Sequence, residues 1–228
     1  MKRNEIFIEA DELLARLDDP KLRIFDAFLE FFPAEDDALS EFEKYKAGHI
    51  PGAAFFDHQE FSDSSSPNAY TILPADKLAE KLGAIGISED SEIIFYSDMM
   101  PTVTRAWWLL YYAGHGNVKV LNGGLAAWKE AGGAIEEGAR QYEPANYKAQ
   151  FKPEVFANKE EVQAAQINDQ VVVINTLPDD FADGALIAGS SRLSCLNMMD
   201  EFRVLLPDEQ ILNYLQQGAN GERIITYC

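Results

Sequence analysis

The chain has 228 residues, of which 47% are hydrophobic and 25% are charged, so a packed globular core is expected and disorder is not. Its 38 acidic residues outnumber its 19 basic residues and give a net charge of -19. Such a surface repels phosphates, which argues against a nucleic acid or an anionic membrane as the partner but leaves a small substrate open.

The N-terminal residues, MKRNEIFIEADELLARLDDP, include acidic side chains and no apolar core segment. They do not form a secretory signal, and the sequence has no run of about 18 apolar residues that would span a bilayer. We therefore expect a cytoplasmic protein. Its two cysteines, Cys195 and Cys228, are too few for a disulfide framework, so each is expected to be either a small buried residue or a reactive thiol.

The first half of the chain alternates between strand-like and helix-like segments. β-Branched and aromatic runs predict strands, while apolar residues at helical spacing, opened by proline or closed by glycine, predict helices. In chain order these are a strand at 21–28, a helix at 73–86, a strand at 91–97, a helix at 101–116, a strand at 118–124 and a helix at 125–133. This alternation favours an α/β fold with a mainly parallel sheet flanked by helices.

The second half repeats part of the first. It opens with a predicted helix at 159–166 and a predicted strand at 170–176. Residues 205–228 then follow the same order as residues 72–97: Leu-Pro, a helix, glycine, Glu, Ile-Ile, one residue and Tyr. The first copy ends in Ser97 and the second in Cys228, so the chain is predicted to contain two homologous α/β domains.

The expected domain organisation is a complete domain at 1–135, a linker at 136–157, and the start of a second domain at 158–228 that stops after its central strand. A buried parallel strand without its crossover helix would expose an apolar face and lack a neighbour in the sheet. The sequence is therefore predicted to be cut from a longer chain. The alternative is a real truncation that leaves a poorly stable protein.

Three stretches of the first half carry a family resemblance. They are FDA in the first strand, AGHIPGAAFFD at 47–57 and YSDMMPTVTRAWWLLYYAGHGNVKVLNGGLAAW at 96–128. In combination they resemble the rhodanese-type sulfurtransferases, the tandem-domain group that includes thiosulfate and 3-mercaptopyruvate sulfurtransferases. The resemblance is clear over 20–135 and faint over 158–228.

The resemblance implies a role for Cys228. In this family the first domain is usually inert, and the second carries a cysteine directly after its central strand, followed by a loop of backbone amides around the sulfur. The thiolate takes a sulfane sulfur from a small anionic donor, becomes a persulfide, and passes the sulfur to cyanide or to a thiol. Cys228 stands at that position and Ser97 is its inert counterpart. The resemblance also implies that Arg192 binds the substrate, because family members place an anion-binding arginine nearby; a solvated surface arginine is the alternative.

The chemistry of such a cysteine has a physical basis of its own. Only a thiolate attacks sulfur, and a thiol is mostly protonated at neutral pH. A cysteine at the end of a parallel strand, heading a loop that runs into a helix N-terminus, meets inward-pointing amides and the positive end of the helix dipole, which favour the anion. Ligands of open α/β sheets also bind beyond the carboxyl ends of the strands.

The remaining chemistry-bearing residues have more ordinary interpretations. Cys195 has no such context. Asp26 and His49 are expected to be structural, with Asp26 accepting loop hydrogen bonds and His49 bonding the backbone around a Pro-Gly turn. His58 and His115 are isolated and are expected at the surface or in packing. No cluster of histidine and cysteine has metal-ligand spacing, so neither a metal nor a cofactor is expected.

Departures from the family pattern keep two alternatives open. Where the second domain usually has Asp-Ala-Arg, this chain has Asn175, Thr176 and Leu177, and its counterpart of the His-Ile-Pro-Gly turn is degenerate. The first alternative is therefore a catalytically degenerate binding or sulfur-relay module. The second is a rhodanese-related phosphatase, which ranks lower because tandem domains fit sulfur transfer better. The sequence does not decide the sulfur donor, the acceptor or the oligomeric state.

Overall fold

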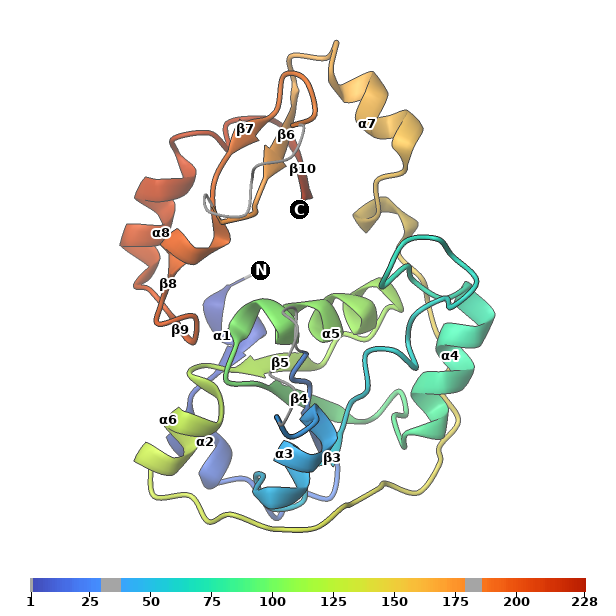
Figure 1. Ribbon diagram of the computed structural model, residues 1–228, viewed down its shortest axis with the longest axis vertical. Helices are drawn as coiled ribbons and strands as arrows, with labels where there is room; N and C mark the ends of the chain where they lie inside the picture. Colours follow the sequence, from blue (N-terminus) through green and yellow to red (C-terminus); the bar gives the residue numbers. More distant parts are fainter. Residues whose placement is uncertain (1, 30–37, 179–185) are drawn as a thin grey trace. The chain divides into compact units, whose positions relative to one another are not determined.

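The computed structural model describes residues 2–29, 38–178 and 186–228. The chain divides into two compact units, Met1–Pro153 and Glu154–Cys228, and each has a parallel sheet of its own (Figure 1). Within the described ranges, no helix combines the length and the apolar character that crossing a membrane requires.

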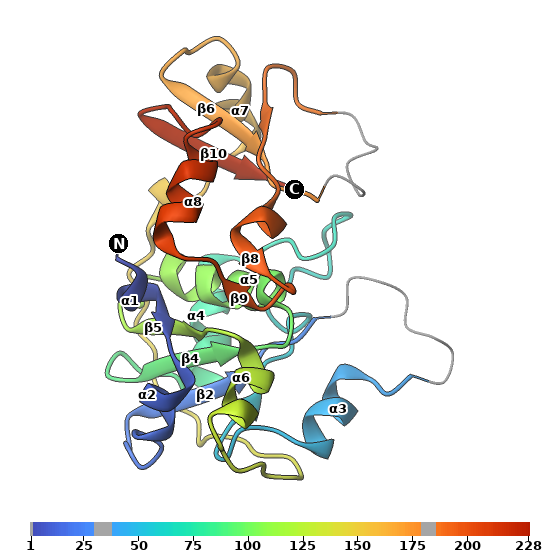
Figure 2. The ribbon, with the colours of Figure 1, turned by 90° about the vertical axis from the view of Figure 1, so that its left-hand side faces the viewer.

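The first unit is built on a five-stranded parallel sheet. Its strands, in spatial order, are β1 (Phe7–Ile8), β5 (Val118–Leu121), β4 (Glu92–Tyr96), β2 (Leu22–Asp26) and β3 (Ala54–Phe55). Its helices are α1 (Arg3–Ile6), α2 (Ala10–Leu14), α3 (Glu41–Ala47), α4 (Ala75–Ala84), α5 (Met100–Tyr112) and α6 (Gly124–Glu130). Figure 2 shows β5, β4 and β2 side by side. The predicted parallel α/β architecture is confirmed, and each strand and helix predicted for this half is present with bounds that differ by a few residues.

Apolar side chains fill both faces of the first sheet. Ile24 and Ile94 pack on one face with the fully buried Trp128 of α6. Because neighbouring residues of a strand point to opposite faces, Phe25 and Phe95 occupy the other face, with ring centroids 5.7 Å apart. Packing on both faces holds the carboxyl ends of β2 and β4 in fixed positions.

The stretch expected as a linker lies against the first unit over much of its length. The Tyr142 hydroxyl donates to the Gly52 carbonyl at 2.7 Å, and the Gln150 amide donates to the Ala113 carbonyl at 3.0 Å. Gly114 lies beneath this stretch with φ +86, and a Cβ there would meet the Gln150 carbonyl oxygen at 2.1 Å. The stretch therefore packs closely enough to require glycine at that position.

The second unit is smaller and contains two sheets. The three-stranded parallel sheet has the order β10 (Arg223–Tyr227), β6 (Val171–Asn175) and β7 (Ser191–Arg192), and β8 (Met199–Asp200) pairs antiparallel with β9 (Val204–Leu205). Its helices are η1 (Pro153–Val155), α7 (Lys159–Ala165), η3 (Cys195–Met198) and α8 (Asp208–Leu215). The helix predicted at 159–166 and the strand predicted at 170–176 are confirmed as α7 and β6. Val173 and Ile225 pack with Ala165 of α7 to form the core of this unit.

Candidate active site at the carboxyl edge of the second sheet

The two parallel sheets match residue by residue where their central strands end. β2 and β4 pair Asp26 with Tyr96, and β6 and β10 pair Asn175 with Tyr227. In both units the next amide along β2 or β6 donates to the carbonyl of that tyrosine at 2.9 Å. The residue after Tyr96 therefore corresponds to the residue after Tyr227, which is Cys228.

The turns that lead into β3 in the first unit and into β7 in the second unit also have the same geometry. Ile50–Gly52 in the first unit corresponds to Ile187–Gly189 in the second. In each turn the amide after the glycine donates to the isoleucine carbonyl, at 2.9 Å and 3.0 Å. The two glycines have φ values of 84 and 78, in the left-handed region that favours glycine. The turn that is degenerate in sequence keeps its shape because the glycine is retained.

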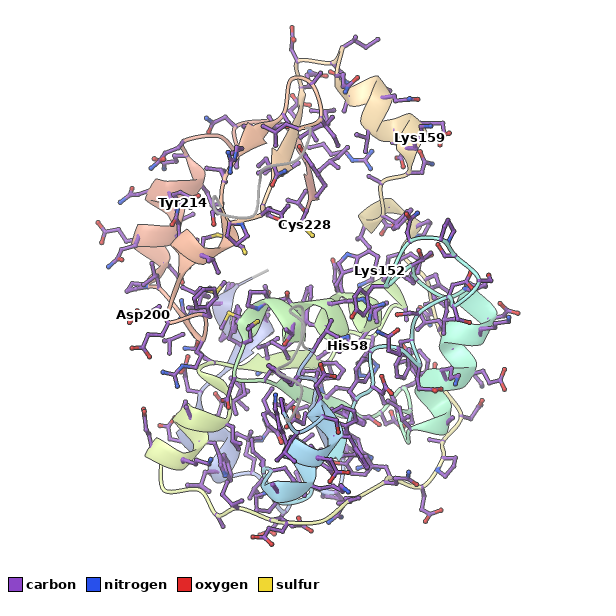
Figure 3. All side chains as sticks on the ribbon, viewed as in Figure 1. His58, Lys152, Lys159, Asp200, Tyr214 and Cys228 are labelled. Carbon is purple, nitrogen blue, oxygen red and sulfur yellow. The ribbon has the colours of Figure 1, made fainter. Side chains whose placement is uncertain are left out.

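Cys228 follows β10 directly and is exposed at the carboxyl edge of the three-stranded sheet (Figure 3). This is the edge at which open α/β sheets bind ligands. Its neighbour Tyr227 is fixed by two hydrogen bonds: its hydroxyl oxygen accepts from the Ile187 amide at 3.0 Å and lies 2.9 Å from the Ser190 hydroxyl. The backbone that carries the thiol is thus tied to the turn before β7.

Arg192 lies on β7, paired with Asn175 of β6, and is exposed. Desolvation opposes ionisation of Tyr227, but hydrogen bonds with Ser190, the Ile187 amide and Asn175, together with the positive charge of Arg192, hold the pKa of Tyr227 below its ordinary value. The charge of Arg192 therefore acts at the same edge of the sheet that carries Cys228.

Asn175 takes the place that Asp26 has in the first unit. It is 4% exposed, and its side-chain oxygen accepts from the Leu177 amide at 2.8 Å. The corresponding bond in the first unit runs from the Phe28 amide to Asp26 at 3.2 Å. The amide side chain therefore keeps the local hydrogen bond while removing a buried negative charge from this edge.

Cys195 is half-buried at the start of η3. Its amide donates to the Thr176 carbonyl at 3.0 Å. Burial is the main reason that the pKa of the Cys195 thiol is raised, and the negative charge of Cys228 adds to the shift. Sequence reasoning gave this cysteine no context; the structure brings it to the edge that carries Cys228.

Ser97 occupies the matching position in the first unit and is only 4% exposed. Its hydroxyl oxygen accepts from the Met99 amide at 3.0 Å and lies 2.9 Å from the Thr102 hydroxyl, which itself lies 2.7 Å from the Met99 carbonyl. The Ser97 oxygen therefore accepts two hydrogen bonds, one from the Met99 amide and one from the Thr102 hydroxyl. The Ser97 hydroxyl is hydrogen-bonded and buried, unlike the exposed thiol of Cys228.

Asp26 and His49 both contact the backbone of the first unit. Desolvation raises the pKa of Asp26 to about 7, while hydrogen bonds from the Phe28 amide and the Tyr96 hydroxyl oppose the shift. His49 is 1% exposed, stacks on Tyr45 with ring centroids 4.3 Å apart, and donates from Nδ1 to the Tyr45 carbonyl at 3.0 Å. Both side chains support the fold at these positions.

His58 and His115 are buried, so they take part in packing and are not at the surface. His58 Nε2 donates to the Ala27 carbonyl at 2.9 Å, which leaves Nδ1 to accept from Arg105 at 3.0 Å. Desolvation lowers the pKa of His58 to about 4, so the ring is neutral at physiological pH. Sequence reasoning missed Arg105, whose partners are distant in the chain. Among the residues that the structure describes, no group of three or more His, Cys, Asp or Glu side chains could hold a metal ion.

These features define a tandem α/β protein whose second unit presents an exposed cysteine at the carboxyl edge of its sheet. The family model described as "Rhodanese-like domain" matches residues 9–131, and the chain belongs to the rhodanese family. It is similar to the 3-mercaptopyruvate sulfurtransferase of Escherichia coli strain K12, with 32% identity over 75% of this chain and 61% of that protein. It is also similar to the thiosulfate sulfurtransferase of Bos taurus, with 30% identity over 80% of this chain and 65% of that protein.

A solved structure supports the same fold. The crystal structure of SseA from Escherichia coli, described as a 3-mercaptopyruvate sulfotransferase with the rhodanese fold, matches with a TM-score of 0.87 and 27% identity. The match covers 97% of this chain and 87% of SseA. The chain spans less than two thirds of the length of the Escherichia coli and Bos taurus sulfurtransferases named above.

Proposed function

We propose that this protein is a sulfurtransferase that carries a sulfane sulfur as a persulfide on Cys228, within the second of two rhodanese-like domains. The main supporting observation is the position of Cys228, exposed beyond β10 where the first unit has the buried, hydrogen-bonded Ser97. Relatives named as 3-mercaptopyruvate and thiosulfate sulfurtransferases support the same reaction class.

In the proposed reaction the Cys228 thiolate attacks the sulfane sulfur of the donor. With thiosulfate, one S–S bond forms to Cys228, the S–S bond of thiosulfate breaks, and sulfite leaves with the bonding electron pair. A nucleophilic acceptor, such as cyanide or a thiolate, then attacks the outer sulfur of the persulfide. Its S–S bond breaks and the Cys228 thiolate is restored, so the cycle needs no external oxidant or reductant.

Arg192 is proposed to attract the anionic donor. The protein carries a net charge of -19, so an anion approaches against an unfavourable field unless a local cation offsets it. Arg192 lies on β7, which pairs with the central strand β6. Its positive charge acts on Tyr227, the residue before Cys228. Asn175 stands where the first unit has Asp26, so this edge lacks the carboxylate that would repel an anion.

The proposal is tested by incubating the protein with thiosulfate or with 3-mercaptopyruvate and measuring its intact mass. A gain of one sulfur atom that maps to Cys228, and thiocyanate formation on adding cyanide, are expected. Neither is expected in Cys228→Ser. A wild-type chain that gains no sulfur from either donor would contradict the proposal.

The contribution of Arg192 is tested by Arg192→Gln, with Arg223→Gln as the matched control. Both changes remove one exposed positive charge from the second unit, but Arg223 begins β10 at the opposite edge of the sheet and pairs with Glu161. Arg192→Gln is expected to raise the thiosulfate KM about tenfold, the effect of roughly 1.4 kcal/mol of lost attraction. Equal effects of the two substitutions would show that Arg192 acts only through net charge.

A catalytically degenerate sulfur-relay module is the second candidate. Leu177 stands where the family has an arginine in the second domain, and this departure favours reduced turnover. Such a module would accept sulfur on Cys228 yet release no thiocyanate with cyanide. The mass and thiocyanate measurements together separate the two candidates.

A further inference from the structure

Both cysteines of the chain lie at one edge of the three-stranded sheet in the second unit. Cys228 follows β10, and Cys195 follows β7 by three residues. β10 and β7 flank β6 in a parallel arrangement, so the carboxyl ends of all three strands meet at this edge. The two thiols therefore lie on either side of the residue that ends β6.

Thr176, the first residue after β6, links the backbones that carry the two thiols. Its amide and its hydroxyl donate to the Tyr227 carbonyl at 2.9 Å and 3.2 Å. Its own carbonyl accepts from the Cys195 amide at 3.0 Å. These bonds draw the start of η3 toward the end of β10.

The first unit uses the position of Cys195 differently. The strand register that pairs Phe55 with Asp26 pairs Arg192 with Asn175, and three residues further along each chain are His58 and Cys195. Both ring nitrogens of His58 form hydrogen bonds within the first unit, one with the Ala27 carbonyl and one with Arg105. The second unit has the thiol of Cys195 at the position of His58, and it has Cys228 at the position of Ser97.

We infer that Cys195 is a second sulfur-carrying residue, which accepts the sulfane sulfur from the persulfide on Cys228. This inference rests on the proposed function. The Cys195 thiolate attacks the outer sulfur of Cys228–S–SH, one S–S bond forms to Cys195, and the S–S bond to Cys228 breaks. The products are Cys195–S–SH and the Cys228 thiolate, so no net oxidation or reduction takes place.

The positions of the two residues, beyond opposite outer strands of the sheet, favour sulfur transfer over a disulfide. Strands of a sheet are about 4.8 Å apart, so residues in register on the two outer strands of three are about 9.6 Å apart. A disulfide requires Cα atoms roughly 4.4–6.8 Å apart. Transfer of a sulfane sulfur places a third sulfur between the two thiols and extends this range by about 2 Å, to roughly 9 Å. The hydrogen bond from the Cys195 amide to the Thr176 carbonyl holds the start of η3 beside the end of the central strand β6.

The half-buried position of Cys195 gives the transfer a pH dependence. Burial, and the charge of Cys228 after it, raise the pKa of Cys195, so less of this thiol is ionised at neutral pH than at an ordinary cysteine. The transfer is therefore expected to accelerate as the pH rises from about 7 to about 9. Cys228 is the charged group that acts on Cys195, and Arg192 acts on Tyr227 beside Cys228.

The test follows the sulfur by mass spectrometry. The protein is incubated with thiosulfate, and its thiols and persulfides are then blocked with iodoacetamide. Trypsin cleaves after Arg192, Arg203 and Arg223, so Cys195 and Cys228 fall on separate peptides. The extra sulfur is expected first on Cys228 and then on Cys195, with the second step several-fold faster at pH 9 than at pH 7.

Two variants decide the outcome. Cys195→Ser is expected to load sulfur on Cys228 and keep it there, and Cys228→Ser is expected to load none. Sulfur that stays on Cys228 in the wild-type chain at both pH values overturns the relay alone. Equal loading of Cys195 in Cys228→Ser also overturns it, because Cys195 would then load directly. Absence of sulfur from both peptides of the wild-type chain overturns the proposed function together with the relay.

Discussion

Replacing Asp26 with asparagine is expected to stabilise the first unit at neutral and alkaline pH. Asp26 is 8% exposed, and desolvation raises its pKa from 3.8 to about 7. The second unit shows that the amide fits, since Asn175 occupies the matching position and keeps the corresponding bond to the backbone at 2.8 Å. Asp26→Asn removes an ionisation that opposes folding and retains the local hydrogen bond.

The magnitude follows from the shift in the Asp26 pKa. Above about pH 8 the carboxyl is ionised in both the folded and the unfolded chain, and the shift of about three units costs about 4 kcal/mol of folding free energy. Below about pH 4 it is protonated in both states and costs nothing. Between these limits unfolding releases a proton, so the stability of the wild-type unit falls by about 1.4 kcal/mol per pH unit as the pH rises. The stabilisation by Asp26→Asn is therefore expected to be near zero at pH 4 and to grow to about 4 kcal/mol at pH 8.

Urea unfolding followed by tryptophan fluorescence measures this effect, because all three tryptophans, Trp107, Trp108 and Trp128, belong to the first unit. Asp57→Asn is the matched control. Asp57 is exposed and accepts from the Gln59 amide at 2.8 Å, a bond that asparagine keeps. A difference between Asp26→Asn and the wild-type chain that does not change with pH, or a loss of stability at pH 8, would refute the reasoning.

Three further outcomes are expected. Gly189→Ala places a side chain at φ 78 and should destabilise the second unit by about 1 kcal/mol, measured by hydrogen exchange of β6. Gly116→Ala should have little effect, because a Cβ at Gly116 meets open space. Tyr227→Phe leaves the Ile187 amide without its partner and should cost about 1–3 kcal/mol by the same measurement; unchanged exchange would show that water replaces the hydroxyl. Ser97→Cys should gain no sulfur from thiosulfate in an intact-mass assay, since position 97 is 4% exposed, and an adduct there would show that burial does not protect the first unit.

The sequence predicts the strands that are long and apolar, and it misses those that only pairing defines. β2, β4 and β6 each span five residues of β-branched or aromatic character. β3 spans two residues and becomes a strand because the bonds to β2 order it. A two-residue segment has no periodicity, so no pattern in the sequence could reveal it.

The same limit applies to the candidate site. Cys228 is predictable because the repeat carries it to the end of a strand. The place of Cys195 is not, because it depends on the register between β6 and β7, and the turn before β7 retains little of the sequence that marks its counterpart. His58 is likewise interpreted as isolated until the Ala27 carbonyl, 31 residues away in the chain, is seen to accept from its ring.

The two matching edges differ in charge, and this difference supports the proposal that the second edge binds an anionic sulfur donor. At the first edge Asp26 is surrounded by Asp98 and Glu41, whose negative charges help to raise its pKa after desolvation has done so. At the second edge an amide replaces the carboxyl and Arg192 adds a positive charge that acts on Tyr227. At the first edge these carboxylates would repel both a thiolate and an anionic donor, since like charges in a partly desolvated site are weakly screened. The exchange of serine for cysteine therefore coincides with a change of the electrostatic surroundings. A thiol placed at position 97 would lack a nearby positive charge such as that of Arg192 even if it became exposed.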